Sequence, residues 1–193
     1  MELTIKRQEK FSRGQLLLRT FFGWIYILIP HYFLLFFVGI WSMILSFLAF
    51  WAVLFTGKYP KSWYEYQIKM MRWGIRVSSS FFNLIDGYPQ FGLNGSNPQI
   101  TLDAPYPEKL SRGLLILRLF LGWIYIYIPH GFCIYFRILW GFILMFIAWW
   151  VVLFTGKYPE GLFNYQAGTL RWAIRLGMYA SFLTDKYPPF SGK

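Results

Sequence analysis

Charged residues are scarce in this sequence, and their scarcity excludes most soluble folds. Only 14% of the 193 residues are Asp, Glu, Lys or Arg, whereas 56% are hydrophobic and 23% are aromatic. A soluble domain usually carries about a quarter charged residues. A soluble fold of this size could not bury so much apolar surface, so much of that surface must face lipid.

Groups that could carry chemistry are also few. Cys133 is the only cysteine, so no intrachain disulfide and no CxxC metal site can form. His31 and His130 each follow a proline and have no acidic or cysteine neighbour at the same depth. We expect each imidazole to bond a carbonyl that proline leaves free; the alternative is a paired-histidine cofactor site. We find no combination of nucleophile, base and acid, so we predict no enzyme, no metal and no cofactor.

The chain is strongly basic, with a net charge of +11 at pH 7. The basic residues flank long apolar runs, a placement that favours anionic lipid headgroups over nucleic acid. The eight acidic residues all lie outside those runs. Without a carboxylate inside the membrane, an ion-coupled transporter is disfavoured.

The sequence contains an internal repeat. At an offset of 99 residues, positions 3–91 align with 102–190 without a gap, and 45 of the 89 aligned positions are identical. We therefore divide the chain into a first module at 1–91, a linker at 92–101 and a second module at 102–193. Residues 3–6 and 100–103 alternate in polarity and could form short strands.

Each module holds one apolar run, at 16–55 and 115–154. A straight helix of this length would be roughly 60 Å long, about twice the hydrocarbon thickness of a bilayer. We therefore predict that each run folds back near Gly39 or Gly141. The expected fold is an all-α membrane protein in which two parallel-repeat hairpins supply four transmembrane helices, at 15–37, 40–56, 114–136 and 139–155.

The charge distribution predicts how these hairpins are oriented. Of the 19 Lys and Arg residues, 18 flank the hairpins or lie within their first turn, and Arg137 is the exception. The positive-inside bias then places both termini and the linker in the cytoplasm. The two modules would share one orientation, related by a pseudo-twofold axis along the membrane normal. Arg19 and Arg118, one turn inside their helices, are expected to reach lipid phosphates.

After each hairpin we predict an amphipathic interfacial helix, at 61–84 and 160–183. A basic stripe beside aromatic rings is typical of a helix at the lipid–water boundary. A glycine can end the membrane helix and a proline can start the next one, so the pair predicts a corner at the membrane surface. Together with a tryptophan in the following helix and an aspartate after it, this glycine and proline make up the structural repeat motif. Its residues are Gly57, Pro60, Trp73 and Asp86, with Gly156, Pro159, Trp172 and Asp185 in the second module.

These motifs resemble an uncharacterised family of bacterial integral membrane proteins, catalogued as a domain of unknown function that often occurs in tandem. The resemblance rests on Leu-Phe-Thr-Gly-Lys-Tyr-Pro, Arg-Trp-x-x-Arg and Asp-x-Tyr-Pro-Pro-Phe, and it covers both modules. It implies a multi-pass protein of the bacterial inner membrane. It implies no activity, cofactor or catalytic residue.

The sequence favours a non-catalytic scaffold or accessory subunit that packs with a protein partner or with itself. We predict that it binds anionic lipid headgroups at the cytoplasmic face through guanidinium and ammonium groups. The predicted headgroup-binding residues are Lys58, Arg72, Arg76, Lys157, Arg171 and Arg175. The alternative is a lipid transporter, scramblase or channel with a path between the two repeats.

Overall fold

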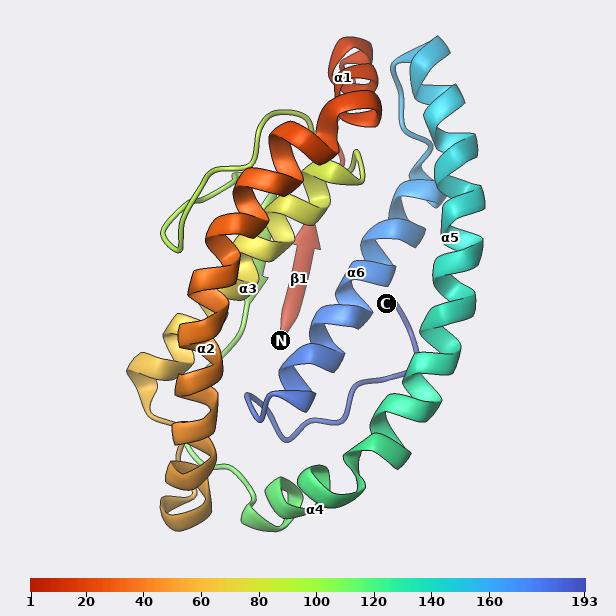
Figure 1. Cartoon of the computed structure of the whole chain (residues 1–193). Coiled ribbons are helices and arrows are strands. Elements are labelled where there is room, and N and C mark those ends of the chain that lie inside the picture. The colour runs from red at the N-terminus through yellow and green to blue at the C-terminus, as the bar shows by residue number, and fades with distance from the viewer.

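The computed structural model describes residues 1–193 and confirms a mostly helical protein, with 67% of the chain in helices (Figure 1). The prediction of an all-α fold is incomplete, because a two-stranded sheet is also present. The elements of the first module are β1 (Glu2–Ile5), α1 (Arg13–Gly23), η1 (Trp24–Leu28), α2 (Ile29–Thr56) and α3 (Lys61–Phe81). Those of the second are β2 (Ile100–Asp103), α4 (Arg112–Gly122), η2 (Trp123–Tyr127), α5 (Ile128–Thr155) and α6 (Glu160–Ala180).

The predicted fold-back of the apolar runs is wrong. Elements α1, η1 and α2 form one continuous helix of 44 residues, and α4, η2 and α5 form another. Gly39 and Gly141 lie inside these helices, because a helical glycine lowers stability without forcing a turn. The prolines do not break the helices either. A π-helical turn precedes each one, and the amide of Ile29, just before Pro30, bonds the carbonyl of Trp24, five residues back.

The corner after each long helix is as predicted. Gly57 and Gly156 adopt the left-handed conformation, with φ of 72° and 70°, and end the two long helices. Helices α3 and α6 then start directly after Pro60 and Pro159. Each runs back along its own long helix, so that the long helices lie on the two outer sides of the molecule and α3 and α6 lie between them (Figure 1).

The sheet relates the two modules by local symmetry. Strands β1 and β2 are antiparallel, and Leu3 pairs directly with Leu102, its own equivalent at the 99-residue offset. Both leucines are buried, whereas the neighbouring Glu2 and Asp103 are exposed. The pseudo-twofold axis therefore passes through this leucine pair, and the sheet turns its polar side outward.

The modules also interlock at the ends of the long helices. The Leu110 amide donates to the Gly57 carbonyl, and the Phe11 amide donates to the Gly156 carbonyl, both at 2.8 Å. One hydrophobic cluster of 22 buried residues draws on both modules. The two halves of the sequence thus share one core.

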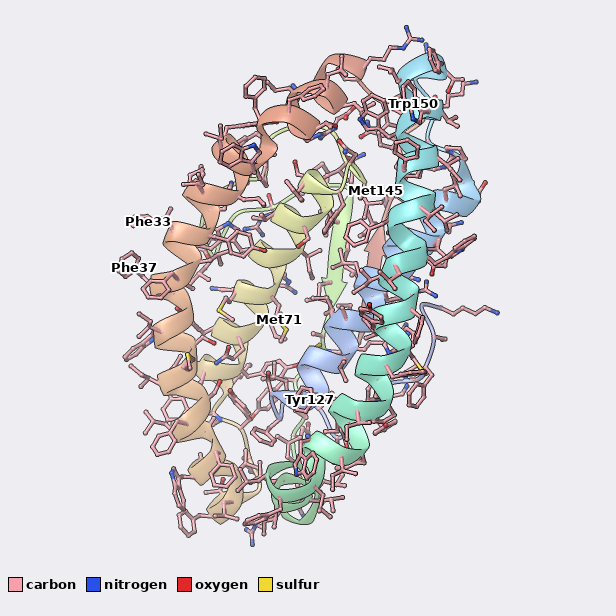
Figure 2. All side chains as sticks on the ribbon, turned by 45° about the vertical axis from the view of Figure 1, so that its right-hand side comes forward. Phe33, Phe37, Met71, Tyr127, Met145 and Trp150 are labelled. Atoms are coloured by element: carbon pink, nitrogen blue, oxygen red, sulfur yellow. The ribbon has the colours of Figure 1, made fainter.

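Both long helices are long and apolar enough to cross a membrane. Only a narrow stripe of α2 is buried, and it includes His31, Ser42, Ala49 and Val53. The rest of the helix surface carries exposed aromatic and aliphatic side chains, and Figure 2 shows Phe33 and Phe37 projecting outward from α2.

Candidate functional site

The six basic residues predicted to bind headgroups fall into two groups in the structure. Lys58 and Lys157 are exposed at the two corners. The four arginines of α3 and α6 instead donate hydrogen bonds to backbone carbonyls of the protein itself. This difference separates surface cations from cations that are built into the fold.

The first arginine of each pair holds the sheet. Arg72 Nη2 donates to the Leu102 carbonyl of β2 at 2.9 Å, and Arg171 Nε donates to the Leu3 carbonyl of β1 at 2.9 Å. Each arginine therefore reaches from its own module to the strand of the other module. Both bonds anchor the short sheet, which could not persist alone in water.

The second arginine of each pair holds the segment after the closing Tyr-Pro motif. Arg76 Nη2 donates to the Gly92 carbonyl at 2.6 Å, and Arg175 donates to the Lys193 carbonyl. Arg76 is only 2% exposed and forms no ion pair. Burial and the nearby Arg72 cation lower the pKa of Arg76. A buried guanidinium without a carboxylate partner favours an anion nearby.

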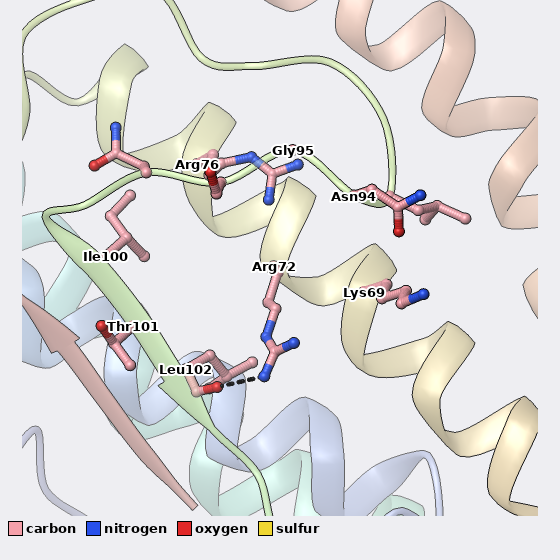
Figure 3. Close-up of a pocket in the computed structure, with 11 residues that line it drawn as sticks. Lys69, Arg72, Arg76, Asn94, Gly95, Ile100, Thr101 and Leu102 are labelled. Atoms are coloured by element: carbon pink, nitrogen blue, oxygen red, sulfur yellow. Dashed lines mark hydrogen bonds between the residues drawn. The ribbon is translucent and has the colours of Figure 1, made fainter.

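A basic cavity of about 380 Å³ lies beside these arginines in the first module (Figure 3). We call it the basic pocket, and it contains no acidic side chain. It lies between α3, the loop 93–97 and β2. Its lining residues are Lys69, Arg72, Arg76, Leu93, Asn94, Gly95, Ser96, Asn97, Ile100, Thr101 and Leu102.

The corresponding place in the second module is filled by the chain. Gly168 stands where the first module has Lys69, and Gly192 packs against it: a Cβ on Gly168 would lie 2.9 Å from the Gly192 oxygen. Arg171 Nη1 donates to the same carbonyl. Glu2 occupies the position equivalent to Thr101 and raises the pKa of Arg175, against the lowering effects of burial and of Arg171.

The repeated aspartates are half-buried and form ion pairs with buried arginines. Arg19 lies 2.7 Å from Asp86, and Arg118 lies 2.6 Å from Asp185. Each aspartate also accepts the amide of the serine that caps its long helix, Ser12 at 2.7 Å in the first module. The prediction that Arg19 and Arg118 reach lipid phosphates is wrong, because both side chains are buried against these carboxylates.

The repeated tryptophans explain the histidines. Trp73 Nε1 donates to His31 Nδ1 at 2.8 Å, and the Phe91 ring stacks on the imidazole with centroids 3.9 Å apart. Trp172, His130 and Phe190 repeat this arrangement in the second module. The expected bond from imidazole to a proline-freed carbonyl is replaced by this indole bond. Each histidine joins its long helix to its own inner helix.

Exposed cations gather at both ends of the long helices, where the modules meet. Around Gly57 are Lys58 and two residues of the second module, Lys109 and Arg112. Around Gly156 the equivalents are Lys157, Lys10 and Arg13, and Arg13 Nη2 donates to the Phe154 carbonyl at 2.8 Å. We call these the two end clusters. None of their six residues forms an ion pair.

Apolar cavities lie on the other side of α3 from the basic pocket. One of about 650 Å³ is lined by Met71, Gly74 and Ser78 together with residues of α2 and α6. Each of these three is two positions from a basic-pocket residue (Lys69, Arg72 or Arg76), which is about 200° around a helix. A second apolar cavity, of about 660 Å³, lies between α1, the end of α3 and α5. One side of α3 therefore faces an apolar cavity and the other side faces the basic pocket.

Comparison with known proteins assigns a domain and no activity. Residues 115–192 match the model of a domain of unknown function (DUF4389). No curated protein and no solved structure matches the chain. An uncharacterised domain thus coincides with most of the second module.

The sequence alone did not identify the basic pocket. Lys69 belongs to the predicted basic stripe, but the loop 93–97 was assigned only to the linker. One available signal was the polar run Asn94-Gly-Ser-Asn-Pro98, which follows the first closing motif. Gly95 lets this loop pass over the arginine, because a Cβ there would lie 2.8 Å from Arg76 Nη2.

Proposed function

We propose that this protein is a non-catalytic membrane component that lies in the plane of one leaflet and binds anionic headgroups with its end clusters. In this proposal the long helices are immersed along their whole length and neither crosses the bilayer. The proposal replaces the multi-pass topology expected from the sequence. The observation that carries it is the position of the charged side of α3 along the length of the first long helix.

The charged side of α3 lies beside the middle of the first long helix. Tyr66 donates to the Val38 carbonyl at 3.0 Å, and Trp73 donates to His31, so the α3 residues between them lie beside the centre of the 44-residue helix. Arg72 is exposed there. A crossing orientation would put this cation at the bilayer centre, which costs about 2.5–3.5 kcal/mol or more. An in-plane orientation leaves it in water.

The two sides of the molecule support the same orientation. The apolar cavity lined by Met71 and Ser78 lies on one side of α3, and the basic pocket lies on the other. A roughly 66 Å apolar helix fits easily in the plane of a membrane and exceeds its thickness twofold. The pseudo-twofold axis would then run along the membrane normal, as the sequence predicted for different helices.

The end clusters supply the headgroup contacts in this proposal. They retain Lys58 and Lys157 from the predicted set and replace Arg72, Arg76, Arg171 and Arg175, which each donate at least one hydrogen bond to a backbone carbonyl of the fold and lie away from the ends of the long helices. Exposed cations at the membrane surface contribute about 1 kcal/mol each with anionic lipid. Anionic lipid is enriched on the cytoplasmic leaflet, so we assign the protein to that side of a bacterial inner membrane.

Spin-label depth measurements test the orientation. Phe37, Ile44 and Phe55 are all exposed and share one face of α2, over a span of about 27 Å. Nitroxides at these positions, in a Cys133→Ser background, should report equal depths from their oxygen and nickel-complex accessibilities. Depths that change by more than about 10 Å along the series would overturn the in-plane orientation.

Lipid retention tests the headgroup contacts. The triple variant Lys58→Gln, Lys109→Gln, Arg112→Gln should lose several-fold of the phosphatidylglycerol that co-purifies with the protein, as measured by mass spectrometry. Lys61→Gln is the control, because Lys61 is exposed on the next helix and outside the cluster. Equal lipid content in both variants would contradict the assignment.

The competing function, a lipid or ion path between the repeats, finds less support. The interface between the modules is occupied by a shared core that includes Leu3, Leu102 and Phe163. An accessory role requires a partner, and a mild-detergent pull-down that yields no stoichiometric protein and no self-association would count against it. Flux or lipid flipping by reconstituted vesicles would favour the path instead.

A further inference from the structure

We propose that the basic pocket of the first module is a binding site for a phosphate-bearing ligand, and that the second module has lost or never formed its counterpart. This inference deepens the proposed function by adding a discrete site on the polar side of the molecule. It rests on three features of the pocket: its charge, its donors and its comparison with the second module.

The charge of the pocket is unbalanced. Lys69, Arg72 and Arg76 contribute three cations, and no carboxylate lines the cavity. None of the three forms an ion pair. Two guanidinium groups near one ammonium group are the side chains that recognise phosphate oxygens, since the planar fork of arginine matches an O–P–O edge.

The donors are not all used by the fold. Each guanidinium has five N–H groups. Arg72 uses one for the Leu102 carbonyl, and Arg76 uses two for the Gln90 and Gly92 carbonyls. These bonds fix the direction of both side chains and leave the remaining N–H groups for a ligand. Amide and hydroxyl groups of Asn94, Ser96 and Thr101 complete the wall.

The second module acts as an internal comparison. Gly168 replaces Lys69, Glu2 replaces Thr101, and the Gly192 backbone fills the space. There Arg171 bonds the carbonyl of Gly192 and Arg175 bonds that of Lys193, and the cavity of about 210 Å³ that Arg175 lines includes neither Gly168 nor Arg171. The retained arginines thus serve the fold in both modules, and a cavity lined by both arginines and a lysine at position 69 is specific to the first.

The position of the pocket bears on the source of the phosphate. It lies on the opposite side of α3 from the apolar cavity lined by Met71 and Ser78. A soluble phosphate ester would reach it from water, whereas a headgroup would have to come from a second membrane or from a lipid drawn away from its leaflet. The shared chemistry is a phosphate group, and the experiment separates the two sources.

The experiment uses the full chain in nanodiscs and titration calorimetry. Inorganic phosphate, pyrophosphate and glycerol 3-phosphate are titrated into protein in zwitterionic phosphatidylcholine discs. Lys69→Glu should weaken binding at least about tenfold, which corresponds to about 1.4 kcal/mol. Lys69 has no hydrogen bond in the fold, so this variant tests the pocket without removing a structural contact. Lys61→Glu makes the same charge change on the exposed start of α3 and should bind like the wild type.

Each outcome is decisive. Binding of a soluble probe that Lys69→Glu weakens and Lys61→Glu does not supports a soluble ligand. Absence of such binding, together with phosphatidylglycerol retention that depends on Lys69, supports a lipid phosphate. Absence of both, or equal effects of the two variants, overturns the site. Because the soluble titration in phosphatidylcholine does not depend on the end clusters, its failure is distinguishable from failure of the proposed function.

Discussion

The two modules of this protein use identical residues to build the scaffold and different residues to line one cavity. The repeated ion pairs have nearly equal lengths, 2.7 Å for Arg19–Asp86 and 2.6 Å for Arg118–Asp185. Around the inner helices, by contrast, Lys69 faces an open pocket and Gly168 is covered by the backbone of Gly192. In this protein, residues that recur in both modules therefore build the structure. A residue that differs between the modules, as Lys69 and Gly168 do, indicates a candidate site.

The largest loss of stability is expected when the ion pairs of the two modules are removed. We expect Asp86→Asn and Asp185→Asn each to lower the free energy of unfolding by about 3–5 kcal/mol, because each leaves a buried arginine without its carboxylate. Asp86→Asn should cost more, since Asp86 also accepts a bond from Gln8 at 2.5 Å. Chemical unfolding in mild detergent measures both. Glu9→Gln, at an exposed residue without a partner, should stay within about 0.5 kcal/mol of the wild type.

A smaller loss of stability is expected at Gly168, where the backbone of Gly192 fills the place that corresponds to the basic pocket. Gly168→Ala should destabilise the protein by about 1–3 kcal/mol, because the new Cβ would meet the Gly192 oxygen at 2.9 Å. Gly177 lies on the same helix with nothing within 4 Å of a Cβ, so Gly177→Ala should be neutral or stabilising. The same unfolding assay, with hydrogen exchange of residues 190–193, distinguishes the two. Equal stability of both variants would mean that the filled counterpart contributes nothing.

The indole–imidazole bonds should be equivalent in the two modules. Trp73→Phe and Trp172→Phe each leave a buried imidazole nitrogen without its donor, at a cost of about 1–3 kcal/mol. Trp41, which is exposed on α2, provides a control whose change to Phe should be nearly silent. A difference of more than about 1 kcal/mol between the two tryptophan variants would show that the modules are not equivalent here.

Local features of the fold could be predicted from the sequence, whereas the path of the apolar runs could not. The corners at Gly57 and Gly156 depend on neighbouring residues only, and the structure has them as expected. Whether a 40-residue apolar run turns back depends on what its inner face contacts. Here His31 and Ser42, on either side of Gly39, bond Trp73 and Gln67 of the inner helix, so the packing runs through the expected turn and the helix continues.

The site was partly predictable for a similar reason. The stripe containing Arg72 and Arg76 was evident from helical spacing, and its basic character is retained. The destinations of their donors were not evident, because Leu102 and Gly92 reach them through tertiary folding. Periodicity identifies the face of a helix on which a side chain lies, and it carries no information about which distant backbone covers that face.

The mildest test uses a residue that differs between the modules. Tyr64 is buried and donates to the Pro105 carbonyl at 3.0 Å, and the second module has Phe163 at this position. Burial raises the pKa of Tyr64 from 10.0 to about 12. The folded state therefore favours the neutral phenol, and the stabilisation it gives is complete below pH 10 and is lost as the pH rises towards 12.

Tyr64→Phe should cost about 1 kcal/mol at neutral pH through the lost hydrogen bond. The difference between wild type and variant should vanish near pH 11 and change sign by pH 12, since only the wild type has this group to ionise and a shift of two pKa units corresponds to about 2.7 kcal/mol. Unfolding curves at pH 8, 10, 11 and 12 measure it, and the other buried tyrosines cancel because both proteins contain them. A difference that stays constant over this range would show that the phenol is not protected by burial.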